Sequence, residues 1–453
     1  MTLSSIWRHL RRFWWLLPAL GKRYHFFLLA GFSIGLVLFM SVAFVFPALS
    51  VRLKQPENKR VGIVGSYTLT NFPVQIQNQL SFGLTNLTSS GEATPAAALS
   101  WEVNEEGKSY IFHLAQNLFW QDGTPFKAGD VNYNLKDAEI STPDEFTIQI
   151  KLKEPFSPLP ALLSQPLFKP GLVGLGSYKV NSLETTDGQL TALSLTPVGQ
   201  NNPQPTIKYR FYPSAQKAIL AYKLGEIDVI KGLTDTSLLV GWPVKVETVK
   251  NRDWHLALFY NTEDKLLSEK NVRLALTYAL PDFPSEEKAD SPFSPNSWAY
   301  SGQLKKYNPD LGLAKKLIAQ AEEGTKSAGQ KITLSTTSSY QNLAGEIAKS
   351  WENLGVQTEV KIENKVPEDF QVLLAVQEIS PDPDQYSLWH STQEKTNITR
   401  YKSPRIDKLL EDGRKFTDKE ERLKKYLDFQ KYLLDDAPAA FLFYPPTYNI
   451  SRH

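Results

Sequence analysis

The chain has 453 residues, of which 42% are hydrophobic and 22% charged, so wholesale disorder is excluded and there is enough chain for about three domains. It has no cysteine, which excludes disulfides, thiol catalysis and cysteine-ligated metal sites. The net charge is +2, but residues 1–23 hold five basic and no acidic side chains, and residues 49–60 hold four basic and one acidic. Residues 61–453 therefore carry a net charge of −6, which argues against a nucleic-acid partner.

The first predicted element is a membrane-spanning helix over residues 26–48, a run without a charged side chain. At about 1.5 Å per residue, a helix of this length crosses a hydrocarbon core of about 30 Å. Residues 1–25 are basic and include Trp7 and Trp14, which is typical of an amphipathic segment on the cytoplasmic membrane surface. Residues 49–60 form a linker to the main domain.

A cleaved signal peptide is the alternative interpretation, because Ala48 and Ser50 resemble a small-x-small cleavage site. The basic region and the apolar run are both longer than a secretory signal needs, so an uncleaved anchor is favoured. Lysine and arginine flank the run on both sides, and charge alone therefore does not decide which side of the membrane the main domain occupies.

Short strands and turns follow in the first half of the main domain. Residues 109–114 and 147–152 are predicted strands, the second with strict alternation of apolar and polar side chains. Residues 122–125, with the sequence Asp-Gly-Thr-Pro, are a predicted turn. The polar stretch 181–205 and the proline- and serine-rich stretch 281–297 are interpreted as loops.

The second half shows a regular alternation of strands and helices. The predicted strands are 331–336, 356–362 and 370–376. One predicted helix is opened by residues 308–310 and stopped by Gly324, and the others are 343–354, 404–415 and 418–435. Strand, helix and strand within 331–362 form a βαβ unit, which implies parallel pairing of the two strands. The main domain is therefore predicted to be α/β with mixed sheets.

The common signatures of catalysis are missing. The sequence has no phosphate-binding glycine loop, no His-Glu-x-x-His pair and no Gly-x-Ser-x-Gly motif. Its six histidines never form a close pair, so no metal site is predicted. We therefore predict that the protein is not an enzyme, with no catalytic residue and no cofactor.

Several blocks, in order along the chain, resemble the family 5 extracellular solute-binding proteins, which are receptors of ABC importers for oligopeptides, dipeptides and nickel. The blocks are residues 101–114, 120–131, 174–180, 221–228, 259–262, 272–279, 381–386 and 437–438. The resemblance implies a two-lobed periplasmic-binding-protein type II fold that closes on its ligand, preceded here by one N-terminal transmembrane helix. It also implies a shortened middle domain, because only a short stretch separates a helix beginning at Asp130 from the strand 147–152.

The resemblance assigns the domains of residues 61–453. Lobe 1 is expected over about 61–250 together with the tail 436–453, and lobe 2 over about 255–435. It implies a single-pass plasma-membrane protein with a cytoplasmic N-terminus and an extracytoplasmic domain. This domain would capture peptides in the cleft between the lobes and deliver them to ABC permease subunits. The alternatives are an anchored peptide-binding sensor or chaperone without import, and a receptor for a sugar or a metal chelate.

The resemblance also indicates ligand-binding residues. Peptide-binding relatives hold the free amino group of the ligand with an aspartate four residues before the proline that corresponds to Pro383, and here that position is Ile379. Either Glu378 takes over after a local register shift, or the ligand has no free amino terminus. The other candidates are Tyr386, Trp389 and Trp298 as stacking surfaces and Asn261 as a hydrogen-bonding group; Arg273 is expected to anchor a loop carboxylate.

Overall fold

The computed structural model describes residues 58–104, 106–199, 204–284, 286–325 and 331–452, the side chains of 322–325 excepted, and positions 26, 30, 31, 33–37, 39 and 40. Most of the predicted membrane helix therefore lies outside the described residues, as do the predicted cytoplasmic segment and the linker up to residue 57. No helix within the described part is long and apolar enough to cross a membrane. The chain divides into two compact units, residues 1–58 with 203–206 and residues 59–202 with 207–453.

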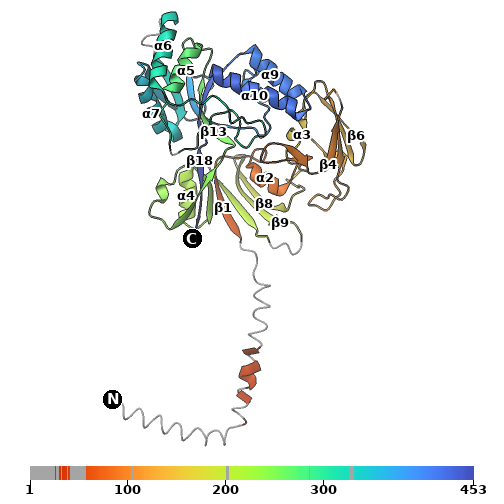
Figure 1. Cartoon of the computed structure of the whole chain (residues 1–453). Helices are drawn as coiled ribbons and strands as arrows, with labels where there is room; N and C mark the ends of the chain where they lie inside the picture. The colour runs from red at the N-terminus through yellow and green to blue at the C-terminus, as the bar shows by residue number, and fades with distance from the viewer. Residues whose placement is uncertain are drawn as a thin grey trace, which may run out of the picture. The chain divides into compact units, whose positions relative to one another are not determined.

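A seven-stranded sheet forms the base of the larger unit, with the order β12-β18-β11-β1-β10-β9-β8 (Figure 1). Its strands are β1 (Lys59–Val64), β8 (Tyr178–Thr186), β9 (Gln189–Pro197), β10 (Ile207–Tyr212), β11 (Val229–Leu233), β12 (Val244–Lys250) and β18 (Pro446–Arg452). Helices α2 (Val74–Leu80) and α4 (Ala215–Lys223) pack against it through two apolar clusters. The central strand β1 is parallel to β10 and β11.

The prediction of a loop over residues 181–205 is wrong for most of that stretch. Strands β8 and β9 form a long antiparallel hairpin there. Its turn is Asp187-Gly188, and both residues have positive φ, 51° and 75°. This is the backbone that a two-residue turn of type I′ requires, and Asp-Gly is a preferred sequence for it. The polar side chains of the stretch lie on the exposed parts of the two strands.

A four-stranded antiparallel sheet with the order β4-β5-β7-β6 comes next. Its strands are β4 (Ala98–Val103), β5 (Ser109–Leu114), β6 (Ala138–Asp144) and β7 (Thr147–Leu152). A small hairpin of β2 (Thr85–Leu87) and β3 (Ala93–Pro95) precedes these strands in the chain, and a short helix α3 (Leu159–Leu162) follows them. The two strands predicted here are confirmed as β5 and β7. The helix expected from Asp130 is absent: a single 3-10 turn, Ala128–Asp130, ends there, and Asp130 accepts hydrogen bonds from Trp120 Nε1 and Lys127 N.

A five-stranded mixed sheet with the order β15-β14-β16-β13-β17 contains the regular second half. Its strands are β13 (Trp254–Tyr260), β14 (Lys331–Thr337), β15 (Gln357–Glu363), β16 (Val372–Glu378) and β17 (Ala439–Phe443). Its helices are α5 (Lys270–Tyr278), α6 (Leu311–Thr325), α7 (Gln341–Glu352), α8 (Tyr386–Trp389), α9 (Pro404–Lys415) and α10 (Lys419–Asp436). The predicted βαβ unit is confirmed, because β14 and β15 pair in parallel around α7.

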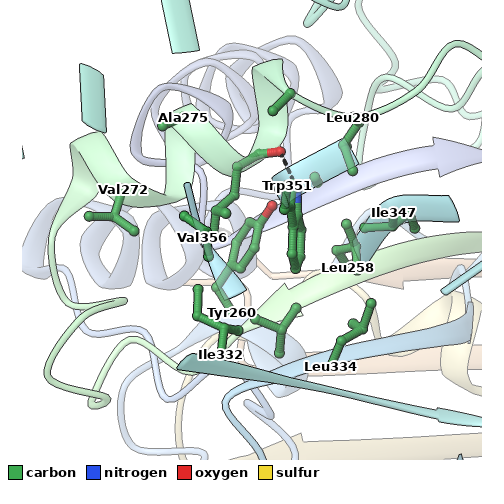
Figure 2. Close-up of a cluster of buried hydrophobic side chains, with 14 of the residues drawn as sticks. Leu258, Tyr260, Val272, Ala275, Leu280, Ile332, Leu334, Ile347, Trp351 and Val356 are labelled. Carbon is green, nitrogen blue, oxygen red and sulfur yellow. Dashed lines mark hydrogen bonds between the residues drawn. The ribbon is translucent and has the colours of Figure 1, made fainter. Parts of the chain in front are cut away.

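Both faces of this sheet are covered by helices. Leu256, Leu258 and Tyr260 of β13 belong to a core shared with α5, α6 and α7, where Trp351 donates from Nε1 to the carbonyl of Leu276 at 2.9 Å (Figure 2). The alternate residues of β13 belong to a second core, shared with α9 and α10. The near-continuous burial of β13 follows from this cover on both sides.

The end of the chain contributes to both large sheets. Strand β17 pairs with β13 in the five-stranded sheet, and β18 pairs with β11 and β12 in the seven-stranded sheet. The sequence placed residues 436–453 together in lobe 1, whereas in the structure only the β18 part of this tail joins the seven-stranded sheet. The chain therefore connects the two sheets between Phe443 and Pro446.

Candidate ligand-binding site

The end of strand β16 holds the position that the sequence singles out. Glu378 pairs with Trp254 of β13, and the amide of Ile379 donates to the carbonyl of Asp253 at 2.7 Å. Side chains alternate along a strand, so Ile379 shares the face of Leu373 and Ala375, which pack toward α9 and α10. Glu378 lies on the opposite face.

This register separates Glu378 from the position of Ile379. A slip by one residue would move every side chain of β16 to the other face, and the buried pattern of Val372, Leu373 and Leu374 opposes such a slip. Burial raises the pKa of Glu378, with a smaller contribution from the nearby Asp253. The structure thus contains no register shift at Glu378, and a binding role for this carboxylate stays a prediction.

Ile379 lies in a small buried cluster with Ala289 and Tyr444, against the ring of Phe441. The imidazole of His255 meets the Phe441 ring edge-to-face, with ring centres 4.8 Å apart. Burial lowers the pKa of His255 to about 4, so this ring is neutral at physiological pH. The position corresponding to the family's aspartate is therefore apolar and has an uncharged histidine nearby.

Three buried polar atoms in this neighbourhood have no hydrogen-bond partner among the described residues. They are Nδ1 of His255, Oη of Tyr444 and Nε2 of Gln385. Gln385 accepts a hydrogen bond from Nε1 of Trp389, whose ring also contacts Phe441. Buried polar groups are nearly always paired in folded proteins, so unpaired ones mark a place where a ligand or water molecules supply the partner. Sequence reasoning missed all three, because nothing in their local pattern shows that they converge on Phe441.

The two aromatic candidates of α8 are both occupied by neighbours within the fold. Trp389 is buried in the core against α9 and α10. The ring of Tyr386 stacks on His390 at 4.0 Å, and the guanidinium of Arg414 lies 3.8 Å from the ring centre. These contacts cover the stacking surfaces that the sequence suggested for a ligand.

Trp298 lies where two parts of the larger unit meet. Its amide donates to the carbonyl of Ser90, in the turn between β2 and β3, at 3.0 Å. Glu92 of the same turn forms an ion pair with Lys419 of α10, and Lys419 lies over the Trp298 ring. Gly91 is so close to Pro381 that an added Cβ would lie 1.8 Å from the Pro381 carbonyl oxygen. We call residues 88–92 the contact turn; it covers Trp298 and segment 381–384.

Two acid–arginine pairs connect segment 381–384 to helices α9 and α10. Asp382 accepts from Arg422 at 3.1 Å, and both side chains are buried. Asp384 accepts from Arg414 through both carboxylate oxygens, at 2.7 to 3.0 Å. The Asp-Pro-Asp sequence was noticed as part of a motif, but its arginine partners lie 30 and 40 residues further along the chain. These pairs fix the backbone that follows β16.

The remaining two predicted residues lie elsewhere. Asn261 follows the other end of β13 and is buried; its Nδ2 donates to the Phe370 carbonyl at 3.0 Å, and its Oδ1 accepts from the Glu263 amide. Arg273 donates to four backbone carbonyls rather than to a carboxylate, so the expectation of a loop carboxylate is wrong. One of those carbonyls belongs to Ala437, a residue in the left-handed region with a φ of 47°. The side chains of Asn261 and Arg273 thus form hydrogen bonds to the backbone, and a ligand contact by Asn261 stays a prediction.

These features define a two-lobed α/β protein of the periplasmic-binding-protein fold. A family model for bacterial extracellular solute-binding proteins, family 5, matches residues 92–397. Because this match covers more than half of the chain, the protein belongs to that family, whose members are receptors for solutes rather than enzymes.

Known relatives agree with this assignment. The oligopeptide-binding protein AppA of Bacillus subtilis is 26% identical over 278 residues, an alignment that covers 53% of this chain and 50% of AppA. The periplasmic murein peptide-binding protein MppA of Escherichia coli is 24% identical over 446 residues, covering 81% of this chain and 82% of MppA. The crystal structure of NikZ from Campylobacter jejuni in complex with Ni(L-His) superposes with a TM-score of 0.72 at 20% identity, covering 88% of this chain and 94% of NikZ. The structural likeness shows the shared fold.

Proposed function

We propose that this protein is a receptor that binds peptides or closely related solutes and delivers them to an ABC importer. The family assignment supports a solute receptor, and the names of AppA and MppA support a peptide as the ligand. The contact turn meets Trp298 and segment 381–384 through a few exposed polar contacts, which suits a protein that closes and reopens around its ligand.

The observation that carries the choice of ligand is the apolar cluster around Ile379. A buried ammonium group needs an acidic partner, since leaving it unpaired costs about 3 kcal/mol. Ile379 cannot serve as that partner, and Glu378 lies on the other face of β16. Other acids near the cluster are already paired, Asp382 and Asp384 with arginines, Glu287 with Arg252 and Asp290 with Lys306. The preferred ligands are therefore peptides or peptide-like solutes whose recognition does not depend on a free amino terminus.

A pair of matched peptides tests this proposal. Calorimetry would compare a peptide found by mass spectrometry to co-purify with the protein, in its free-amino form and in its N-acetylated form. We expect the two affinities to agree within about threefold, because no acid holds the ammonium group. A loss of tenfold or more on acetylation would contradict the ligand class. Recovery of only sugars or metal chelates would contradict peptide binding altogether.

We further propose that residues 26–48 anchor the protein in the plasma membrane as a single uncleaved helix, with residues 1–25 in the cytoplasm. The uncharged run and the export of family members support this topology. A reporter fused after His453 would test it: activity of an extracytoplasmic reporter is expected. Activity of a cytoplasmic reporter at that position would refute the orientation, and a mature protein that begins near Ser50 would refute the anchor.

A further inference from the structure

One end of the seven-stranded sheet carries exposed apolar side chains that the binding site does not use. At this end β1 begins, α4 ends and β12 begins (Figure 1). Arg60 donates to the carbonyl of Gly225, just after α4, at 2.8 Å. Arg452, at the end of β18, donates to the carbonyl of Tyr222 at 2.6 Å. The start of β1, the end of α4 and the end of β18 are thus adjacent.

The exposed side chains lie on the end of α4 and on the segment that leads into β12. Val240 is 83% exposed, Leu224 68%, Leu238 51% and Trp242 43%. Lys223 joins the two segments: its Nζ donates to the Leu238 carbonyl at 2.8 Å and lies 4.8 Å from the centre of the Trp242 ring. These four apolar residues together with Lys223 are called the apolar end. Large exposed apolar groups side by side mark a contact surface rather than ordinary solvent exposure.

Positive charge surrounds the apolar end. Lys59, Lys208, Lys223 and Lys245 lie at this end of the sheet, and none of them forms an ion pair with a described residue. Of the nearby acids, Asp228 is paired with Arg60 and Arg452 and Glu226 with Arg210, whereas Glu247 of β12 has no ion-pair partner among the described residues. The rest of the domain is acidic, with a net charge of −6 over residues 61–453. The surface is therefore basic against an acidic background, which favours an anionic partner.

The length of chain before β1 limits how far this end lies from residue 48. Residues 49–58 separate the uncharged run from β1, and ten residues span at most about 35 Å when fully extended. These residues also contribute basic side chains, Arg52 and Lys54. If the run lies in a bilayer, the start of β1 can therefore be at most about 35 Å from the end of that run.

We propose that the apolar end is a membrane-contact surface, which inserts Leu224, Leu238, Val240 and Trp242 among lipid headgroups while the four lysines bind anionic lipid phosphates. A tryptophan beside a lysine suits the interface, because the indole spans the apolar and polar regions and the lysine extends its charge to the headgroups. The contact is separate from the ligand-binding site and holds the domain in a defined orientation on the bilayer.

The cysteine-free chain allows a direct test with a single polarity-sensitive probe. Full-length Val240→Cys, labelled with the probe and reconstituted in vesicles of phosphatidylcholine with phosphatidylglycerol, is expected to show blue-shifted emission that acyl-chain-brominated lipids quench. Val366→Cys is the matched control, because Val366 is also apolar and 52% exposed but follows β15 in the other large sheet. Its probe is expected to show neither effect.

A third probe separates the surface from the anchor. Ser41→Cys lies in the uncharged run and reports insertion of that run by itself. Quenching at Ser41 without quenching at Val240 would overturn the membrane-contact surface while leaving the anchor in place. Quenching at Val240 only after the permease is added would also overturn it, in favour of a protein contact. Lys223→Glu with Lys245→Glu should abolish the blue shift at Val240, and peptide affinity should stay unchanged.

Discussion

The interior around the five-stranded sheet and the contact turn hold the same segment, 381–384, in opposite ways. From the interior, Asp382 is held by Arg422, and both side chains are buried. The contact turn approaches this segment at Gly91 and is joined to the neighbouring helix α10, where Glu92 pairs with Lys419 while both side chains remain about half exposed. Buried pairs are costly to break because one charge is left without a partner, whereas exposed pairs contribute little. The buried pair of Asp382 and Arg422 therefore fixes the backbone of segment 381–384, and the exposed pair of Glu92 and Lys419 is easily broken.

We predict from this difference that the two regions have distinct parts in ligand binding. The cluster around Ile379, Phe441 and His255 belongs to the fixed interior, so its chemistry is present before a ligand arrives. The contact turn has one backbone hydrogen bond to Trp298, one ion pair to Lys419 and a close approach of Gly91 to Pro381, and we predict that it closes over the ligand. Changes in the interior should therefore alter the unfolding free energy, and changes at the turn should alter ligand binding.

Removing Arg422 should have the largest effect on stability. Arg422→Met leaves Asp382 buried without its partner and also removes the hydrogen bond from Nε to the Gly413 carbonyl. We expect the unfolding free energy to fall by about 3–5 kcal/mol in urea denaturation. The double variant Arg422→Met with Asp382→Asn should be more stable than the single variant, because the stranded charge is gone. A double variant no more stable than Arg422→Met would show that charge pairing is not the cause.

Acid should weaken the interior through His255. Burial lowers its pKa from 6.5 to about 4. Between pH 6.5 and pH 4, His255 is therefore protonated in the unfolded chain but neutral in the folded chain. The stability that neutral His255 contributes is thus complete above pH 6.5 and is lost as the pH falls toward 4, amounting to about 3 kcal/mol. His255→Gln should lack this loss when unfolding is measured at pH 7 and pH 4.5. His113→Gln, at a histidine whose side chain is about half exposed, is the matched control, and equal pH dependence in both variants would contradict the assignment.

Gly91 is expected to affect closure more than stability. Its φ is +85°, and an added Cβ would collide with the Pro381 carbonyl, so Gly91→Ala strains the turn and also keeps it from segment 381–384. Gly123 has the same φ of +85° with nothing within 4 Å of an added Cβ, and Gly123→Ala therefore carries the backbone strain alone. Both variants should lose about 1–3 kcal/mol of stability. In calorimetry only Gly91→Ala should weaken peptide binding, by about tenfold or more; equal affinities in the two variants would show that the turn does not close on the ligand.

Much of the interior could be predicted from sequence because its signals are local. The strand–helix–strand unit of β14, α7 and β15 follows from periodicity and from the glycine at position 355, whose φ is +82°. The hairpin of β8 and β9 was missed although its Asp187-Gly188 turn is a local signal, because the polar strands around it resemble a loop. The division of the final strands between two sheets depends on pairing with residues far away in the chain, which no local pattern shows.

The site was harder to predict than the fold. The predicted strand ends at residue 376, whereas β16 reaches Glu378; with that extension, alternation puts Glu378 and the following Ile379 on opposite faces. Whether a tryptophan lies in the core, as Trp389 does, or at a contact, as Trp298 does, depends on tertiary packing. The approach of His255 and Tyr444 to the Phe441 ring, and of Gln385 to it through Trp389, is also tertiary, because these positions span 190 residues of the chain.

The ion pair of Lys419 should have the smallest effect and so gives the finest test of the contact turn. Hydrogen bonding to Lys419 lowers the pKa of Glu92, which shows that the pair favours the charged carboxylate. Lys419→Ala should change the unfolding free energy by less than about 1 kcal/mol, because both side chains are exposed. Peptide release measured by stopped flow should accelerate by up to about fivefold, and the acceleration should shrink as salt is raised.

Lys424→Ala removes the pair with Glu421 on the same helix, away from the turn, and is the matched control. If both variants release peptide at the wild-type rate, the pair does not hold the turn closed, and the backbone hydrogen bond between Ser90 and Trp298 carries that contact.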